Sequence, residues 1–177
     1  LNCRDLTLKQ IYNIVILYQC FEDLIYDFAG KERKKSIFCV PIGNTQYYNG
    51  FKGMMLGGET YPFWSKYTGL NLRTLHEYGT VEFRHLRGTK DRSTIFNWMH
   101  ILYRLYNYAI SRDTGSLEEE IKQISHNRNY LTLGHNVFGE YFQCLQSPGY
   151  EKKMQEDMAI SKLFITNKTK EIMDGRI

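Results

Sequence analysis

The sequence predicts an α+β fold, in which an antiparallel hairpin at about residues 67–87 is packed by helices. Two observations lead to this class. Apolar residues recur at helical spacing before residue 30 and again after residue 91, whereas the segments between them are rich in β-branched and aromatic residues. Hydrophobic residues make up 42% of the 177 positions, which is enough for a sizeable core. Helix, short strand, hairpin and further helices in that order are typical of α+β proteins.

The first element is a long amphipathic helix from about residue 7 to residue 29. Thr7 followed by Gln10 has the form of a capping box, in which a hydroxyl and an amide close the start of a helix. Gly30 is a typical stop. The apolar positions at helical spacing are Leu8, Ile11, Val15, Tyr18, Phe21, Ile25 and Phe28.

Two less regular segments follow. Residues 36–41 predict a short strand, because isoleucine, phenylalanine and valine alternate before a proline. Residues 42–65 contain five glycines, and their apolar residues show neither helical nor strand periodicity. Loops of this length are often functional, so one hypothesis is a lid over a site, and the other is an ordinary surface excursion.

The hairpin is predicted from two strand-like segments, 67–75 and 80–87, joined by a short turn at 76–79. Side chains alternate faces along a strand. Val81 and Phe83 are expected in the core together with His85, for which we expect a structural role, as we do for His76 in the turn.

The other face of the same strand is polar. Glu82 and Arg84 share it, and a symmetrical four-residue turn places Asn71 across from Arg84 and Arg73 across from Glu82. One interpretation is a cross-strand charge ladder on a wet sheet face. The other is a phosphate and metal site, since a carboxylate can bind Mg²⁺ and a guanidinium can grip a phosphoryl group.

Helices are predicted for most of the remaining chain, at about 91–111, 116–126, 136–146 and 148–166. The first should bury the face formed by Ile95, Met99, Leu102, Tyr106 and Ala109, with Trp98 and Tyr103 flanking it. Residues 1–112 are taken as one domain and residues 113–177 as a helical C-terminal extension.

Charge and cysteine content exclude some classes of protein. The formal net charge is +4, and the one tight basic run, Lys31–Lys35, is interpreted as a solvated helix end. A basic stripe with interleaved aromatics is absent, so nucleic acid is not favoured. The four cysteines are isolated, which indicates a reducing, cytoplasmic location or a viral assembly. No apolar run is long enough to span a bilayer, so a soluble protein without a membrane partner is expected.

The amino-acid sequence of the hairpin region resembles the C-terminal signature of the amidoligase family. The residues that carry the resemblance are Lys66-Tyr-Thr-Gly-Leu-Asn-Leu-Arg-Thr-Leu, then Gly79-Thr-Val-Glu-Phe-Arg-His-Leu-Arg-Gly-Thr89, then a helix with Ile95, Asn97 and Trp98. Upstream, the long helix followed by a basic stretch and an aromatic strand, 33–41, is also similar. The resemblance covers roughly residues 5 to 112.

The resemblance implies a carboxylate–amine ligase with a fold like that of glutamine synthetase. Such enzymes hold ATP and Mg²⁺ against an antiparallel sheet, phosphorylate a carboxylate and let an amine attack the acyl phosphate. Glu82 then corresponds to a metal-ligating glutamate, and Arg84 to the arginine that stabilises the transferring phosphate. Asn71, Arg73 and Lys66 are weaker ATP-binding candidates, and Arg33 is weaker still. The substrates would be peptide or small-molecule carboxylates and amines.

Part of the family's metal site is not in this sequence. The 177 positions contain no Gly-x-Glu-x-Glu and no His-x-His, the patterns that supply further metal ligands in the family's N-terminal half. We therefore expect a half-site that an N-terminal half or a partner chain completes. One alternative is a catalytically inactive interaction module of a viral (phage) or mobile-element assembly. Another is an accidental resemblance, with the polar patch and the 33–35 run binding a polyanion.

Overall fold

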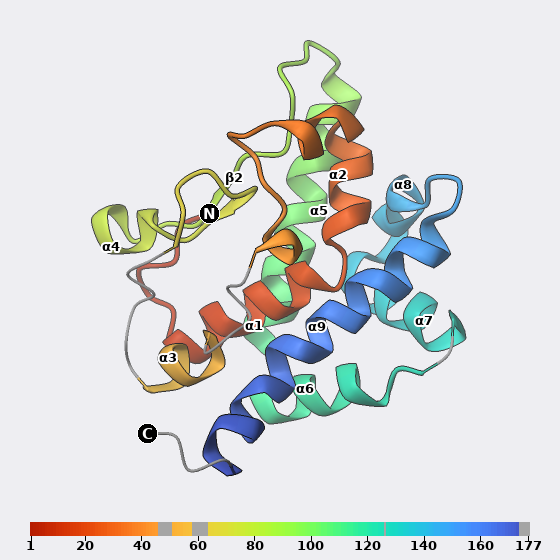
Figure 1. Cartoon of the computed structure of the whole chain (residues 1–177). Coiled ribbons are helices and arrows are strands. Elements are labelled where there is room, and N and C mark those ends of the chain that lie inside the picture. Colours follow the sequence, from red (N-terminus) through yellow and green to blue (C-terminus); the bar gives the residue numbers. More distant parts are fainter. Residues whose placement is uncertain (46–50, 58–63, 126, 174–177) are drawn as a thin grey trace.

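The computed structural model describes residues 1–45, 51–57, 64–125 and 127–173. These residues form a mostly helical body with a small two-stranded antiparallel sheet, which confirms the α+β class. Figure 1 shows the long helices in the body of the molecule and the sheet beside helix α4 at its periphery, near the N-terminus. None of the helices in these ranges combines the length and apolar character needed to cross a bilayer.

The predicted helix at 7–29 is two helices, α1 (Leu8–Gln19) and α2 (Glu22–Ala29). The capping box of Thr7 and Gln10 is present, and Gly30, at a φ of 132°, ends α2 as predicted. The single-helix prediction is wrong at Phe21, whose φ of −131° and ψ of 14° leave the helical region. Asp157, from a distant helix, accepts a hydrogen bond from the backbone N–H of Asp23 at 2.8 Å and so caps the second helix.

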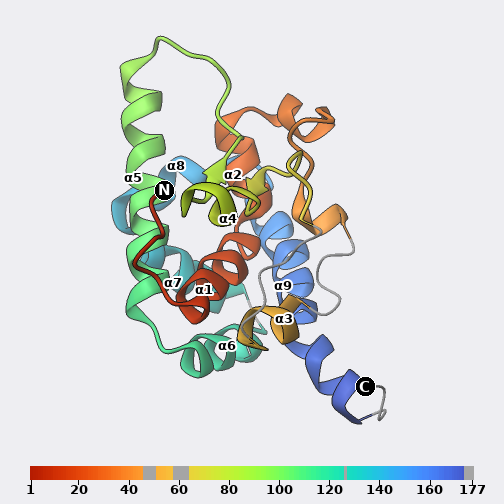
Figure 2. The same ribbon diagram turned by 90° about the vertical axis from the view of Figure 1, so that its left-hand side faces the viewer.

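Helix α1 is the centre of the core. Every residue from position 11 to position 19 is buried. Its neighbours are α3 (Phe51–Gly57), α5 (Arg92–Ser111), α6 (Thr114–Gln123) and α9 (Tyr150–Met173). Figure 2 shows α1 in the middle of these elements, with α5 along one side and α6 below. This part of the helix has no solvent face, so its polar Asn13 donates to the carbonyls of Ala109 and Arg112 at 3.1 and 2.9 Å.

The C-terminal helices pack on the same core. Predictions at 116–126 and 148–166 correspond to α6 and α9, but the segment predicted at 136–146 is divided among α7 (Asn127–Phe138), a 3₁₀ turn η3 (Gly139–Tyr141) and α8 (Phe142–Leu145). Gly139, with a φ of 58°, ends α7 in the left-handed region. Helix α9 lies against α1 and α2, so this part of the chain shares one hydrophobic cluster with the rest. The domain boundary at residue 112 stays a prediction.

The sheet is shorter than predicted and has a different register. Strand β1 (Leu70–Asn71) pairs antiparallel with β2 (Glu82–Phe83), and Asn71 lies opposite Glu82 rather than opposite Arg84. The predicted tight turn is wrong, because a short helix, α4 (Thr74–Tyr78), occupies the connection. The register differs by two residues, so Glu82 and Arg84 keep the face predicted for them.

The strand predicted at 36–41 is reduced to one residue. Lys31–Lys35 form a 3₁₀ helix, η1, and a single parallel bridge joins Val40 to Thr68. Ile37 and Phe38 are exposed, which removes the burial that would favour a longer strand. A second 3₁₀ turn, η2 (Ile42–Asn44), and α3 occupy parts of the segment 42–65. Residues 46–50 and 58–63 of that segment lie outside the described residues, so the lid hypothesis is untested.

Helix α5 is present where predicted, but its buried face is different. Of the predicted face, Ala109 is buried and Leu102 and Tyr106 are partly buried against the core, whereas Ile95 and Met99 are exposed. The other fully buried residues of the helix are Trp98, Ile101 and Leu105. Several sides of this helix are apolar or aromatic, so spacing alone does not select one. The Trp98 ring stacks on Phe28 of α2 at a centroid distance of 6.2 Å, and this contact helps set the rotation of the helix.

Candidate functional site

The small sheet brings three of the predicted site residues together. The side-chain amide of Asn71 donates to Glu82 Oε2 at 2.8 Å, across the two strands. The guanidinium of Arg84 donates to the same oxygen at 2.7 Å, along the strand. We call these three residues the sheet cluster. The Arg84 and Glu82 side chains are 26% and 43% exposed, so the cluster lies at the surface without being fully solvated.

Two other predicted residues are not part of this cluster. Arg73 is exposed at the start of α4, where its backbone N–H donates to Asn71 Oδ1 at 3.0 Å. Its predicted pairing with Glu82 is wrong, because the helical connection begins before the strand reaches position 73. Lys66 is exposed and places its ammonium 5.0 Å from the centre of the Tyr67 ring, a cation–π contact.

The charge state of Glu82 follows from its two donors. Partial burial would raise the pKa of this carboxyl group, but the hydrogen bonds from Arg84 and Asn71, with the charge of Arg84, outweigh burial and hold the pKa below its usual value. Glu82 is therefore an anion at neutral pH. Both hydrogen bonds fall on Oε2, which leaves Oε1 free for a further ligand as far as the described residues are concerned.

Two arginines near this strand contain donors that are not used. The Nε groups of Arg84 and Arg33 are buried and have no hydrogen-bond partner among the described residues. Arg33 comes from η1 and donates through Nη2 to the backbone carbonyl of Arg84 at 2.8 Å. A buried donor without a partner carries a desolvation cost, which an oxygen-rich anion could remove. Sequence reasoning gave Arg33 little weight, because its distance of 51 positions from Arg84 hides their contact.

These residues fit a phosphate group more fully than they fit a metal ion. Mg²⁺ is usually held by one or two carboxylates together with substrate phosphates, and Glu82 can supply one such oxygen. Among the described residues, no group of three or more histidine, cysteine, aspartate or glutamate side chains could hold a metal by itself. The sheet cluster can therefore contribute one metal ligand and one guanidinium group, and Arg33 of η1 lies beside it as a second guanidinium.

A buried polar network lies behind the sheet, on the opposite face of β2. His85 is fully buried, as predicted, and its Nε2 lies 2.7 Å from the hydroxyl of Tyr18. Tyr18 donates to Glu22 at 2.8 Å, so a continuous chain of hydrogen bonds joins His85, Tyr18 and Glu22. Glu22 also accepts from the backbone N–H groups of Ile42 and Gly43, at 2.6 and 2.8 Å. We call His85, Tyr18 and Glu22 the buried network.

Burial sets the charge states in this network. It lowers the pKa of His85 to about 3, with a further contribution from the charge of Arg33, so the imidazole is neutral. Burial raises the pKa of Glu22 to about 7, although three hydrogen bonds from Gly43, Tyr18 and Ile42 act in the opposite direction. These groups face the interior and Gly69 packs directly against His85, so their contacts are those of a structural network.

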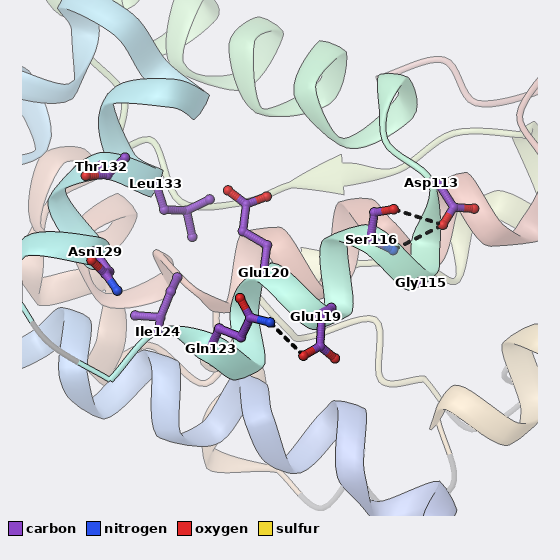
Figure 3. Close-up of a pocket in the computed structure, with 10 residues that line it drawn as sticks. All are labelled: Asp113, Gly115, Ser116, Glu119, Glu120, Gln123, Ile124, Asn129, Thr132 and Leu133. Carbon is purple, nitrogen blue, oxygen red and sulfur yellow. Dashed lines mark hydrogen bonds between the residues drawn. The ribbon is translucent and has the colours of Figure 1, made fainter.

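A separate hollow lies between α6 and α7, with a volume of about 740 Å³. Figure 3 shows its lining, with Glu120 and Leu133 toward its middle and Ile124 and Asn129 at one end. Its carboxylates have partners within the chain: Asp113 caps α6 at Ser116, Glu119 accepts from Gln123, and Glu120 accepts from Arg112 and Tyr108. This hollow contains none of the residues predicted from sequence, and its acidic groups are already engaged.

Comparison with known proteins gives no match. No protein-family profile, no curated protein and no solved structure matches the chain. The amidoligase resemblance therefore depends on the residues quoted from the sequence alone.

Proposed function

We propose that the sheet cluster is half of the nucleotide-phosphate site of a carboxylate–amine ligase of the amidoligase type, on a sheet like that of glutamine synthetase. One observation carries the proposal: an ionised carboxylate with one unengaged oxygen lies beside a guanidinium that has an unused buried donor. These are the two groups that a magnesium–nucleotide complex needs from a protein strand.

Each residue has a distinct role in this proposal. Glu82 Oε1 offers an oxygen ligand to Mg²⁺, while Asn71 holds the carboxylate in place through Oε2. Arg84 binds phosphate oxygens through its guanidinium, and Arg33 adds a second positive charge at the backbone of the same strand. When bound, ATP with Mg²⁺ supplies the phosphoryl group that activates a carboxylate for attack by an amine.

The rest of the site must come from outside the described residues. A single carboxylate does not complete the metal coordination that phosphoryl transfer uses. Further carboxylates, and the pockets for the carboxylate and amine substrates, would be supplied by another segment or by a partner chain. Asn71 is part of the proposed site, whereas the side chains of Arg73 and Lys66 lie outside the sheet cluster.

The test is ATP binding to the chain, measured by ligand-observed NMR, which detects weak complexes. Arg84→Gln should weaken ATP binding about tenfold, because a bidentate guanidinium contact with phosphate is lost. Arg128→Gln is the matched control, since Arg128 is exposed on α7, away from the sheet. Equal loss in both variants would contradict the proposed site. No ATP signal from the unaltered chain would favour the alternative, an inactive interaction module.

A further inference from the structure

The outer face of α5 is apolar and exposed. Phe96, Met99 and Tyr103 are 55%, 63% and 61% exposed, and Ile95 beside them is 38% exposed. The first three are separated by three and four positions, so they form one stripe along the helix, which we call the α5 stripe. Figure 2 shows the first turns of α5 at the edge of the molecule, away from the centre occupied by α1.

The charged side chains of α5 itself have one sign. Arg92 and Arg104 are exposed near its two ends, and Lys90 precedes the helix. The 20 residues of α5 contain no aspartate or glutamate, although the chain has 19 acidic residues. Asp91, directly before the helix, is engaged in capping it through the N–H groups of Ser93 and Thr94, and Glu140 is exposed on η3, which packs against α5. The charge pattern therefore selects an acidic partner.

We propose that the α5 stripe binds an acidic amphipathic helix of a partner protein. The three-and-four spacing is that of a helix–helix seam, in which apolar side chains of the partner would lie against Phe96, Met99 and Tyr103. Glutamate or aspartate side chains at the edges of the partner helix would face Arg92 and Arg104. This inference does not depend on the function of the sheet cluster.

The same arrangement of charged and apolar residues disfavours two other binding partners of the α5 stripe. A second copy paired antiparallel about the middle of the stripe would bring Arg92 against Arg104 of the other molecule, and like charges at an interface reduce affinity. An anionic membrane surface would bind a helix with a broad apolar face. The opposite side of α5 is held in the core by Trp98, Ile101 and Leu105, so only a narrow stripe is available.

The test uses two labelled synthetic helices of about three heptads, with leucine at the seam and either glutamate or lysine at the flanking positions. Fluorescence anisotropy with the chain should give a Kd about tenfold lower for the acidic helix. Arg92→Glu should remove this preference. Lys152→Glu is the matched control, because Lys152 is 84% exposed and also lies in the first turn of a helix, where glutamate suits the helix dipole.

A second pair of variants tests the apolar contact. Met99→Ser should weaken binding of the acidic helix about tenfold, whereas Leu163→Ser, at a 45% exposed position of α9, should leave it unchanged. Equal affinity for the two helices, or no binding of either, would overturn the proposal. So would sedimentation that shows a dimer abolished by Met99→Ser, or phosphatidylserine vesicles that bind the chain through Met99 while the acidic helix does not.

Discussion

The two faces of β2 hold two glutamate-containing clusters in opposite environments. Glu82 is 43% exposed, accepts hydrogen bonds from two side chains and has a lowered pKa. Glu22, in the network behind the strand, is fully buried and has a pKa raised to about 7. The same residue type is therefore an available anion on one face and a structural acceptor on the other. Exposure and the identity of the donors decide which role it takes.

The largest expected effect comes from removing the buried carboxylate. Glu22→Ala should lower the free energy of unfolding by about 3–5 kcal/mol, because it leaves a cavity and removes the acceptor of the buried N–H groups of Ile42 and Gly43. Urea unfolding measures this. A loss below about 1 kcal/mol would show that Glu22 does not hold the network together.

The pH dependence should separate the buried groups from each other. Glu22 has a folded pKa of about 7 against an ordinary value of 4.5, so its contribution to stability is full below pH 4.5 and is lost as pH rises to about 7. This contribution amounts to about 3 kcal/mol. Asp157 of α9, buried against the start of α2, also has a raised pKa, so its contribution to stability has the same sign. His85 has the opposite sign, because its lowered pKa removes stability as pH falls from 6.5 to about 3.

Glu22→Gln removes the contribution of the Glu22 carboxyl group to the pH dependence of stability. Between pH 4.5 and 6.5 the slopes of Glu22 and His85 oppose each other in the unaltered chain. In the variant, of these two contributions only that of His85 remains. The free energy of unfolding should therefore rise more steeply with pH across this window than it does in the unaltered chain. Unfolding free energies measured in urea from pH 4 to pH 8 test this. Identical slopes in the two proteins would mean that Glu22 does not titrate as described.

Close packing between the sheet and the buried network can be tested at Gly69. A Cβ atom there would lie 2.6 Å from His85 Nε2 and closer still to the Tyr26 hydroxyl. Gly69→Ala should therefore cost about 1–3 kcal/mol of stability. Gly88→Ala is the control, since a Cβ at that position meets nothing within 4 Å. Similar melting temperatures for both variants would contradict the close packing.

The smallest effect on stability is expected from a substitution on the exposed face of β2. Glu82→Gln removes a charge that solvent screens, so the free energy of unfolding should change by about 0.5 kcal/mol or less. The same substitution at Glu22 should cost more, because the amide nitrogen would face a backbone donor. Thermal unfolding of the two variants compares the two faces directly. Equal losses would remove the distinction between a site and a structural network.

Local patterns predicted much of this arrangement. The capping box at Thr7, the stop at Gly30 and the alternation that separates Glu82 from His85 depend on neighbours in sequence, and the structure contains all three. The predictions that failed concern features that depend on residues far away in the sequence. The break at Phe21 is accompanied by a cap from Asp157, 134 positions away from the residue it binds.

The predictions of the sheet register and of the buried side of α5 failed for related reasons. The sheet register depended on a connection assumed to be a turn, and the five residues of α4 could equally have been strand by composition. The buried side of α5 is fixed by partners such as Phe28. The contact between Arg33 and the carbonyl of Arg84 involves a backbone atom, so residue types alone could not reveal it.

The central claim, that Glu82 offers a metal ligand to a bound nucleotide, is tested most directly by the Mg²⁺ dependence of ATP binding. Ligand-observed NMR titrations of ATP with and without Mg²⁺ should show tighter binding with the metal for the unaltered chain. The same should hold for Glu156→Gln, a control at a 56% exposed position of α9. In Glu82→Gln the metal should no longer tighten binding. If Mg²⁺ tightens ATP binding equally in all three proteins, Glu82 is not a metal ligand and the proposed ligase half-site is contradicted.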